Sequence, residues 1–211
     1  MTNRMVIIGT GGFAKELLWL ARECRAHDEA IPEVIGFLAS KTEATTFQGL
    51  PVLGNDDWAY HQLDREVFFT LGMGNAQLRR TLAKRYEQWG FKPVSLIHPS
   101  AHYSKAVKIG AGSLLCSGVK LTVDIDLGRH CLLNLQATVG HDVKLFDYTV
   151  IHPGAHISGA CQVGEASEIG TGAVLLPERK VGKNCRVGAG AVVVHDVPDG
   201  FTVIGNPARP S

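Results

Sequence analysis

The chain has 211 residues, which is enough for one large domain or two small ones. It is 45% hydrophobic and 19% charged, and its formal net charge of +1 gives no electrostatic reason to expect nucleic acid as a partner. Its apolar runs are shorter than the ~18 residues of a membrane-spanning helix, and the N-terminal one is too short for a signal peptide. The five cysteines form no CxxC pair. We therefore expect a cytoplasmic protein with reduced thiols and no membrane partner.

The first part of the chain, residues 1–95, alternates between strand-like and helix-like patterns. Apolar runs predict strands at 5–9, 34–38 and 67–72. Apolar residues at helical spacing predict one helix over 13–24, and a second helix starts at Asn75 and ends at Gly90. Alternation of this kind is typical of a small α/β domain, so we expect a Rossmann-like parallel sheet.

The second part, residues 96–211, is dominated by a repeat. From Ile97 to Pro198 it divides into seventeen hexads without a frame shift. The first position is Ile, Leu or Val in sixteen of them, with Tyr103 the exception, and the fifth is mostly small, with Arg179 the one charged residue. Three hexads close one triangular coil whose first-position aliphatics stack into a core. The repeat therefore predicts a parallel β-helix with a C-terminal tail.

The hexad frame assigns each residue to a face of the coil. Cys131, Cys161 and Cys185 all fall on fifth positions, so we interpret them as small core residues. Residues one coil apart lie above one another, and this places Asn134, His152, Gly170 and Gly188 in a single column.

This column is a candidate cofactor site. The corners at Gly170–Thr171 and Gly188–Ala189 are rich in small residues and expose backbone amide and carbonyl groups. A long extended ligand such as coenzyme A fits along such a column. Glycines that serve only turn geometry would give the same pattern.

His141, in the segment TVGHD, is the main catalytic candidate. It occupies the third hexad position, which points outward, and Asp142 follows directly. A carboxylate beside an imidazole fixes its tautomer and raises its basicity, and acyl transfer from a thioester needs such a base. The alternative is a solvated surface pair.

A glycine-rich turn lies between the first strand and the first helix. Residues 9–14, GTGGFA, fit the pattern G-x-G-x-x-[G/A], in which backbone N–H groups approach a diphosphate at a helix N-terminus. Ala39 and Ser40 stand where a dinucleotide site would need an acid, which disfavours NAD(P). The candidate substrate contacts are Gly11, Gly12, Phe13 and Gly72, together with Asn134 in the repeat. A tight strand–helix turn without a ligand is the other interpretation.

Several segments resemble one known family. They are LNLQATVGHDVKLFDYTVIHPGAHISG, IGTGA, VGAGAVV and GNPARP in the repeat, and GTGGFAKE, GFL, LGMGNAQLRR and LIHPSA before it. Together they resemble the sialic acid O-acetyltransferase and UDP-4-amino-sugar N-acetyltransferase family over nearly the whole chain.

The resemblance implies a left-handed β-helix, a homotrimer and acetyl-CoA as co-substrate. It implies that His141 is the base, Asp142 its acidic neighbour and Asn134 the upstream asparagine of the motif. It also implies that the N-terminal loop holds a nucleotide-sugar.

The sequence departs from the family pattern at three places. Gly140 stands where some relatives have a glutamate before the base. Val150 stands where relatives of the bacillosamine-pathway enzyme have a histidine that contacts acetyl-CoA, and His152 lies two residues further on. Ala39 and Ser40 replace an Asp-Asp pair that contacts uracil in the family, so the nucleotide stays open.

We therefore expect an acetyl-CoA-dependent N-acetyltransferase that acts on the amine of a nucleotide-linked amino-sugar in bacterial surface-glycan biosynthesis. The first alternative is an O-acetyltransferase for a sialic-acid-type sugar. The second is a non-catalytic or metal-binding hexapeptide protein. The spacing of His130, His141, His152 and His156 does not fit a zinc site, and we expect no metal.

Overall fold

The α/β domain comes first in the computed structural model, which describes residues 3–40 and 44–211. Its elements, in chain order, are β1 (Arg4–Ile8), α1 (Gly12–His27), β2 (Glu33–Leu38), β3 (Thr46–Phe47), β4 (Leu50–Gly54), α2 (Asp56–Gln62), β5 (Phe68–Leu71) and α3 (Ala76–Gln88). The sheet order is β3-β4-β2-β1-β5, with parallel pairing except between β3 and β4. The predicted parallel α/β sheet is confirmed, and a short antiparallel strand lies at its edge.

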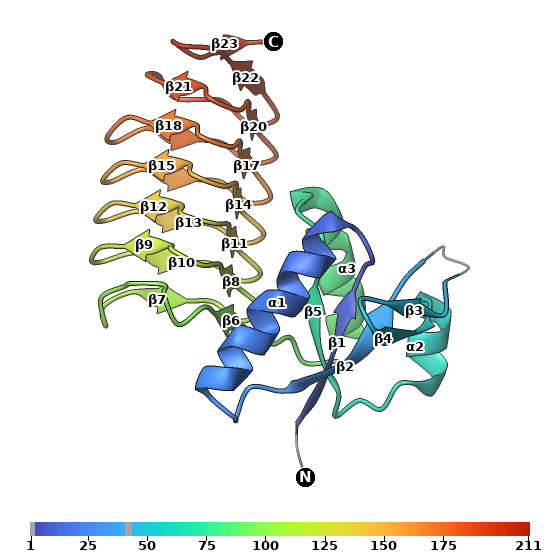
Figure 1. Cartoon of the computed structure of the whole chain (residues 1–211). Coiled ribbons are helices and arrows are strands. Elements are labelled where there is room, and N and C mark those ends of the chain that lie inside the picture. The colour runs from blue at the N-terminus through green and yellow to red at the C-terminus, as the bar shows by residue number, and fades with distance from the viewer. Residues whose placement is uncertain (1–2, 41–43) are drawn as a thin grey trace.

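Both helices predicted from the sequence are present, and α1 extends three residues past its predicted end. α1 buries Leu17, Leu20 and Cys24 at helical spacing, as predicted. The side chain of Asn75 caps α3 by accepting a hydrogen bond from the N–H of Leu78 at 2.9 Å. Figure 1 shows α1 and α3 lying between the sheet and the stacked coils. Both helices therefore belong to the junction of the two parts.

The repeat forms three parallel sheets that wind into one column of coils (Figure 1). The sheet facing the α/β domain contains β6 (Leu96–Ile97), β8 (Leu114–Leu115), β11 (Leu132–Leu133), β14 (Val150–Ile151), β17 (Glu168–Ile169), β20 (Arg186–Val187), β22 (Thr202–Ile204) and β23 (Arg209–Pro210). The second sheet contains β9 (Lys120–Leu121), β12 (Thr138–Val139), β15 (His156–Ile157), β18 (Val174–Leu175) and β21 (Val192–Val193). The third contains β7 (Lys108–Ile109), β10 (Asp126–Leu127), β13 (Lys144–Leu145), β16 (Gln162–Val163) and β19 (Lys180–Val181).

Three corners connect these sheets, and each recurs in every coil. Corner 1 follows the domain-facing sheet and is represented by residues 152–155. Corner 2 follows the second sheet, as at residues 140–143, and corner 3 follows the third sheet, as at residues 164–167. The expected boundary between residues 95 and 96 falls directly before β6.

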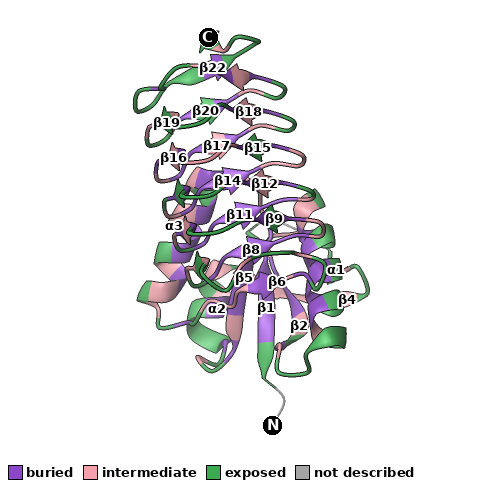
Figure 2. Cartoon of the chain, turned by 90° about the vertical axis from the view of Figure 1, so that its left-hand side faces the viewer, coloured by how far each residue is buried: buried purple, intermediate pink, exposed green. Residues whose placement is uncertain are grey.

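The strand register confirms the predicted coil. Leu133 pairs with Ile151, and Ile151 pairs with Ile169, so successive coils are 18 residues apart. These first-position side chains are fully buried. In Figure 2, buried residues follow the stacked strands and exposed residues gather at the corners. The fourth hexad position turns the chain with a positive φ, which is 61° at Asp142 and 75° at Gly112.

The cysteines are all free and buried. Cys131, Cys161 and Cys185 lie in the core of the β-helix, which confirms their interpretation as small core residues. Burial raises the pKa of Cys131 to about 12 and that of Cys24 to about 11. These thiols therefore remain protonated and unreactive at neutral pH. No helix in the described ranges is long and apolar enough to cross a membrane.

The hexad frame predicts that two neighbouring leucines contribute differently to the stability of the fold. Leu175 is fully buried in the coil, whereas Leu176 is 39% exposed. We expect Leu175→Ala to lower the free energy of unfolding by about 2–5 kcal/mol, because it removes transfer energy and leaves a cavity. Urea denaturation measures the loss, with Phe146→Ala as the control, because Phe146 has the same second hexad position as Leu176, is 48% exposed and lies at corner 3. Equal losses in the two variants would contradict the assignment of faces.

Candidate active site

A cleft of about 550 Å³ opens at the carboxyl ends of the α/β strands. Ligands of open α/β sheets bind at this edge. The residues that line it include all four predicted from the glycine pattern, Gly11, Gly12, Phe13 and Gly72. The structure therefore brings the predicted substrate contacts of the α/β domain together in one cavity.

The start of α1 is open toward this cleft. Gly11 is the N-cap residue, and its backbone is extended. Within the described residues, no heavy atom beyond chain neighbours lies within 4 Å of a Cβ placed on Gly11 or Gly12. The first turn reads Gly-Phe-Ala-Lys, so it supplies no carboxylate of its own. The N–H groups and the positive end of the helix dipole can thus receive an anion such as a diphosphate.

Gly72 has a different role, which is close packing. A Cβ at this position would lie 2.9 Å from the Cβ of Ala14 and 2.9 Å from Cγ2 of Ile7. Only glycine lets β5 approach α1 and β1 this closely. Gly72 therefore shapes the wall of the cleft rather than offering it a side chain.

Sequence reasoning missed the far end of the cleft, where Asp56 and Arg85 lie. Asp56 Oδ2 accepts a hydrogen bond from Arg85 Nη1, and Oδ1 accepts one from the Tyr86 hydroxyl at 2.8 Å. A carboxylate has about four lone-pair sites and a guanidinium five N–H donors, so the pair keeps both acceptors and donors for a ligand. The three residues come from α2 and α3, and only the fold reveals their proximity.

Arg79 fixes the loop that forms the opposite end of the cleft. Its guanidinium is fully buried and donates to the carbonyl oxygens of Leu71 and Met73 at 3.0 Å and of His130 at 3.2 Å. Burial lowers its pKa to about 10, so it stays charged at neutral pH. The loop after β5 is thereby attached to the β-helix.

His141 and Asp142 lie at corner 2. His141 Nδ1 is 2.8 Å from Asp142 Oδ2, and both side chains are more than half exposed. Because Nδ1 faces the carboxylate, Nε2 is the nitrogen available to a substrate. The exposed pair predicted from the sequence is therefore present, with the geometry of an oriented base.

Gly159 determines where the His141 ring lies. It was not among the residues predicted from the sequence. It lies one coil above His141, and a Cβ added there would be 2.5 Å from His141 Nε2. The imidazole thus lies over a position without a side chain. The sequence signal that could have identified Gly159 is its spacing of 18 residues from His141.

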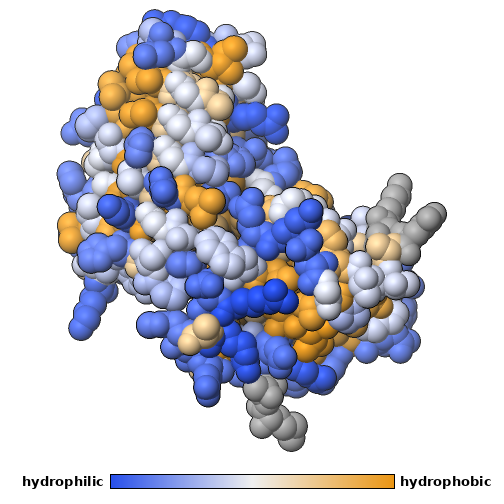
Figure 3. Space-filling model, in the orientation of Figure 1, coloured by the Kyte–Doolittle hydropathy of each residue, from blue (hydrophilic) through white to orange (hydrophobic). Residues whose placement is uncertain are grey.

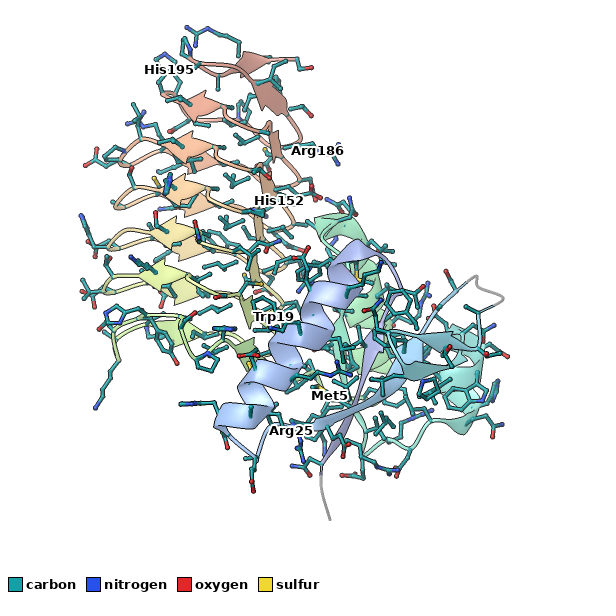
Figure 4. The ribbon with its side chains drawn as sticks, in the orientation of Figure 1. Met5, Trp19, Arg25, His152, Arg186 and His195 are labelled. Atoms are coloured by element: carbon teal, nitrogen blue, oxygen red, sulfur yellow. The ribbon has the colours of Figure 1, made fainter. Side chains whose placement is uncertain are left out.

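The column predicted for coenzyme A lies at corner 1. His152 is partly exposed, and its Cε1 lies 3.7 Å from a Cβ placed on Gly74, in the loop after β5. In Figure 4, His152 lies on the side of the β-helix that faces the α/β domain. The column therefore runs beside one end of the cleft.

The other members of the column are shaped by stacking. Asn134 is buried, and its Oδ1 accepts a hydrogen bond from the N–H of Leu135 at 2.7 Å. A Cβ on Gly170 would lie 2.6 Å from the N of Ala189, so the stacking there requires glycine. Thr171 is exposed beside Gly170. Gly188 lies close beneath Ile204, where a Cβ would come within 2.7 Å of Cγ2.

Val150 and His152 differ in accessibility. Val150 is fully buried and packs with the core of the α/β domain. His152 keeps 28% of its side chain exposed. Of these two candidate cofactor contacts, His152 is the one whose side chain a ligand on the column can reach.

His130, one of the four histidines considered for a metal site, lies at the junction of the two domains. His130 is buried, stacks on Tyr148 with ring centroids 5.6 Å apart, and has Nε2 3.0 Å from Glu87 Oε1. It therefore belongs to the packing between the domains, and burial lowers its pKa. Within the described residues, no group of three or more His, Cys, Asp or Glu side chains could hold a metal ion.

A β-helix of hexapeptide coils beside an α/β domain with a glycine-rich cleft defines a class, the hexapeptide-repeat acyltransferases. The family described as PglD N-terminal domain matches residues 4–86. GDP-perosamine N-acetyltransferase of Escherichia coli O157:H7 is 29% identical over 98% of this chain and 96% of its own length.

Two solved structures are similar over the whole chain. A histidine variant of perosamine N-acetyltransferase from Caulobacter crescentus, in complex with CoA and GDP-perosamine, is 31% identical, with a TM-score of 0.92 over 100% of this chain and 98% of that one. The acetyltransferase domain of PglB from Neisseria gonorrhoeae, in complex with acetyl coenzyme A, is 36% identical, with a TM-score of 0.88 and full coverage of both chains. The chain belongs to this family of hexapeptide-repeat sugar acyltransferases.

The position of Gly159 yields a prediction about catalysis. We expect Gly159→Ala to displace the His141 ring and to lower kcat by about 10- to 100-fold, since a misplacement of about 1 Å can have this effect. The measurement is steady-state acetyl transfer together with the melting temperature. Ser158→Ala is the control, because it changes the neighbouring residue at the same corner without adding an atom beside the His141 ring. Unchanged kcat in the Gly159 variant would contradict this account.

Proposed function

We propose that the protein is an acetyl-CoA-dependent N-acetyltransferase whose acceptor is the amine of a nucleotide-linked amino-sugar. The observation that carries the proposal is the exposed His141, held 2.8 Å from Asp142. Its support is likeness over the whole chain to a perosamine N-acetyltransferase bound to CoA and GDP-perosamine. That acceptor is an amine, which favours N-transfer over the O-transfer alternative.

The chemistry requires one base with a free nitrogen. The neutral amine attacks the thioester carbonyl, and His141 Nε2 takes the proton that the new amide nitrogen loses. Asp142 stabilises the resulting imidazolium through Nδ1. When the tetrahedral intermediate collapses, the thiolate of CoA leaves and receives this proton. The backbone N–H of Thr171 is the donor for the acetyl oxygen or the pantetheine, since the N–H of Gly170 already donates to the carbonyl oxygen of Val187 at 2.8 Å.

The residues that line the cleft define the orientation of the nucleotide-sugar. The diphosphate lies at the open N-terminus of α1, beside Gly11, Gly12 and Phe13. The sugar points toward Gly74 and His152, where the column of acetyl-CoA begins. The nucleobase then lies toward Asp56 and Arg85. These two residues replace the Asp-Asp pair that the family has at positions 39 and 40.

The site needs a second copy of the chain. The cleft adjoins corner 1, whereas His141 lies at corner 2, on the opposite edge of the second sheet. A contact between corner 1 of one protomer and corner 2 of the next is heterologous, so a closed ring is required. We propose a homotrimer in which His141 reaches the cleft of its neighbour. Apolar side chains such as Val123, Leu176 and Ile204 are exposed on the coils and suit such an interface. Figure 3 shows apolar surface on the β-helix.

The reduced state of the thiols supports a cytoplasmic location, because disulfides are rare in that compartment.

The first test is thiol release from acetyl-CoA with a panel of acceptors. The panel contains GDP-perosamine, UDP- and dTDP-linked 4-amino-sugars, and free sialic acid. We expect turnover with an amino-sugar nucleotide and a fall in kcat of about 10²- to 10⁴-fold in His141→Ala, the range that a general base supplies. Turnover only with sialic acid would establish the O-transfer alternative. Equal turnover in both proteins would remove His141 from the mechanism.

The second test concerns the nucleobase end of the cleft. We expect Asp56→Asn to raise the Kd of the preferred nucleoside diphosphate by about 10-fold or more, since a hydrogen bond to a charged group contributes about 1.5–3 kcal/mol. Calorimetric titrations with GDP, UDP and dTDP measure this effect. Asp57→Asn is the matched control, because Asp57 lies outside the cleft lining and its side chain is 85% exposed. Equal Kd values in the two variants would show that Asp56 does not contact the nucleobase.

A further inference from the structure

Glu168 lies where the cleft meets the column. It is on β17 of the domain-facing sheet, paired with Val150 in the coil below and Arg186 in the coil above. Its side chain is only 14% exposed. An acidic side chain this enclosed must find partners for both carboxylate oxygens.

One carboxylate oxygen binds the start of α3. Glu168 Oε1 accepts hydrogen bonds from the backbone N–H of Ala76 at 2.9 Å and from Asn75 Nδ2 at 3.2 Å. The first turn of α3 reads Ala-Gln-Leu-Arg, so it offers no carboxylate to its own helix dipole. The β-helix supplies the anion that this helix N-terminus favours. Glu168 therefore holds the loop at the sugar end of the cleft.

The other carboxylate oxygen faces the column. Glu168 Oε2 lies 3.8 Å from His152 Nε2 and 3.8 Å from Arg186 Nε. Burial alone would raise the pKa of Glu168, but His152, the N–H of Ala76 and Arg186 outweigh it and lower the pKa. The carboxylate is thus an anion that contacts both halves of the site.

We propose that Glu168 is a positioning residue for acetyl transfer, which sets the spacing between the sugar end of the cleft and the acyl-CoA column. It acts through Asn75 and Ala76 on one side and through the His152 imidazole on the other. Reactants must be held to within fractions of an ångström for efficient transfer. This inference rests on the proposed function.

The test uses an isosteric variant, Glu168→Gln. Its amide oxygen can still accept from the N–H of Ala76, but its NH₂ group then faces the donors of His152 and Arg186. We expect kcat to fall by about 10- to 100-fold with the best acceptor of the panel, because the two substrates lose alignment. The Kd of CoA alone and of the nucleoside diphosphate alone should stay at the wild-type value.

Glu165→Gln is the matched control. Glu165 also joins the two domains, through an ion pair with Arg80 at 3.5 Å that involves neither His152 nor Asn75. We expect wild-type kcat in this variant. Equal losses of kcat in the two variants would reduce Glu168 to a domain contact, and wild-type kcat in Glu168→Gln would overturn the inference.

A second readout does not depend on turnover. We expect the imidazole C–H resonances of His152, assigned by NMR with His152→Gln, to shift in Glu168→Gln and to stay in place in Glu165→Gln. Unchanged resonances would overturn the positioning role even if the wild type acetylates no acceptor of the panel. If the resonances shift but no acceptor is acetylated, the contact between Glu168 and His152 is supported and the proposed function is contradicted instead.

Discussion

The 18-residue coil is the constraint on which the rest of the structure depends. Each inner strand of the repeat is two residues long and hydrogen-bonds to the coils on both sides, so the position of a residue in the hexad fixes its surroundings. First and fifth positions are committed to the core. The two histidines of the candidate site therefore lie at corners, His141 at corner 2 and His152 at corner 1. The separation of these two histidines follows from the triangular cross-section.

The α/β domain is attached to this rigid column by buried charges as well as by apolar contacts. Arg79 donates to carbonyl groups on both sides of the junction, and Glu168 accepts from the start of α3. Charged groups are costly to bury unless their hydrogen bonds are satisfied, so these contacts define one relative placement of the two parts. The loop after β5 lies between them, and for this reason the wall of the cleft is also part of the junction.

The periodicity of the sequence was sufficient to predict the β-helix, its register and the column from Asn134 to Gly188, because each of these depends on spacing alone. His141 and Asp142 could be predicted for the same reason, being adjacent at an outward position. The strand β4 contains Pro51 and helix α2 has only seven residues, so neither carries a strong local pattern. Asp56, Arg85 and Glu168 could not be predicted, because their partners are distant in sequence and meet only when the domains pack.

Because the strand register is strict, the length of the column from Asn134 to Gly188 can change only by whole coils. Strands of neighbouring coils are about 4.8 Å apart, so the three steps from Asn134 to Gly188 span about 14 Å. An insertion that breaks the hexad frame would move core aliphatics to the surface, and an insertion of one or two hexads would move every later residue to another face, whereas duplication of a whole coil would leave every face intact. The antiparallel strand β23 closes the last coil and stops further stacking. The column along which we propose that acetyl-CoA lies can therefore change its length only by one whole coil at a time.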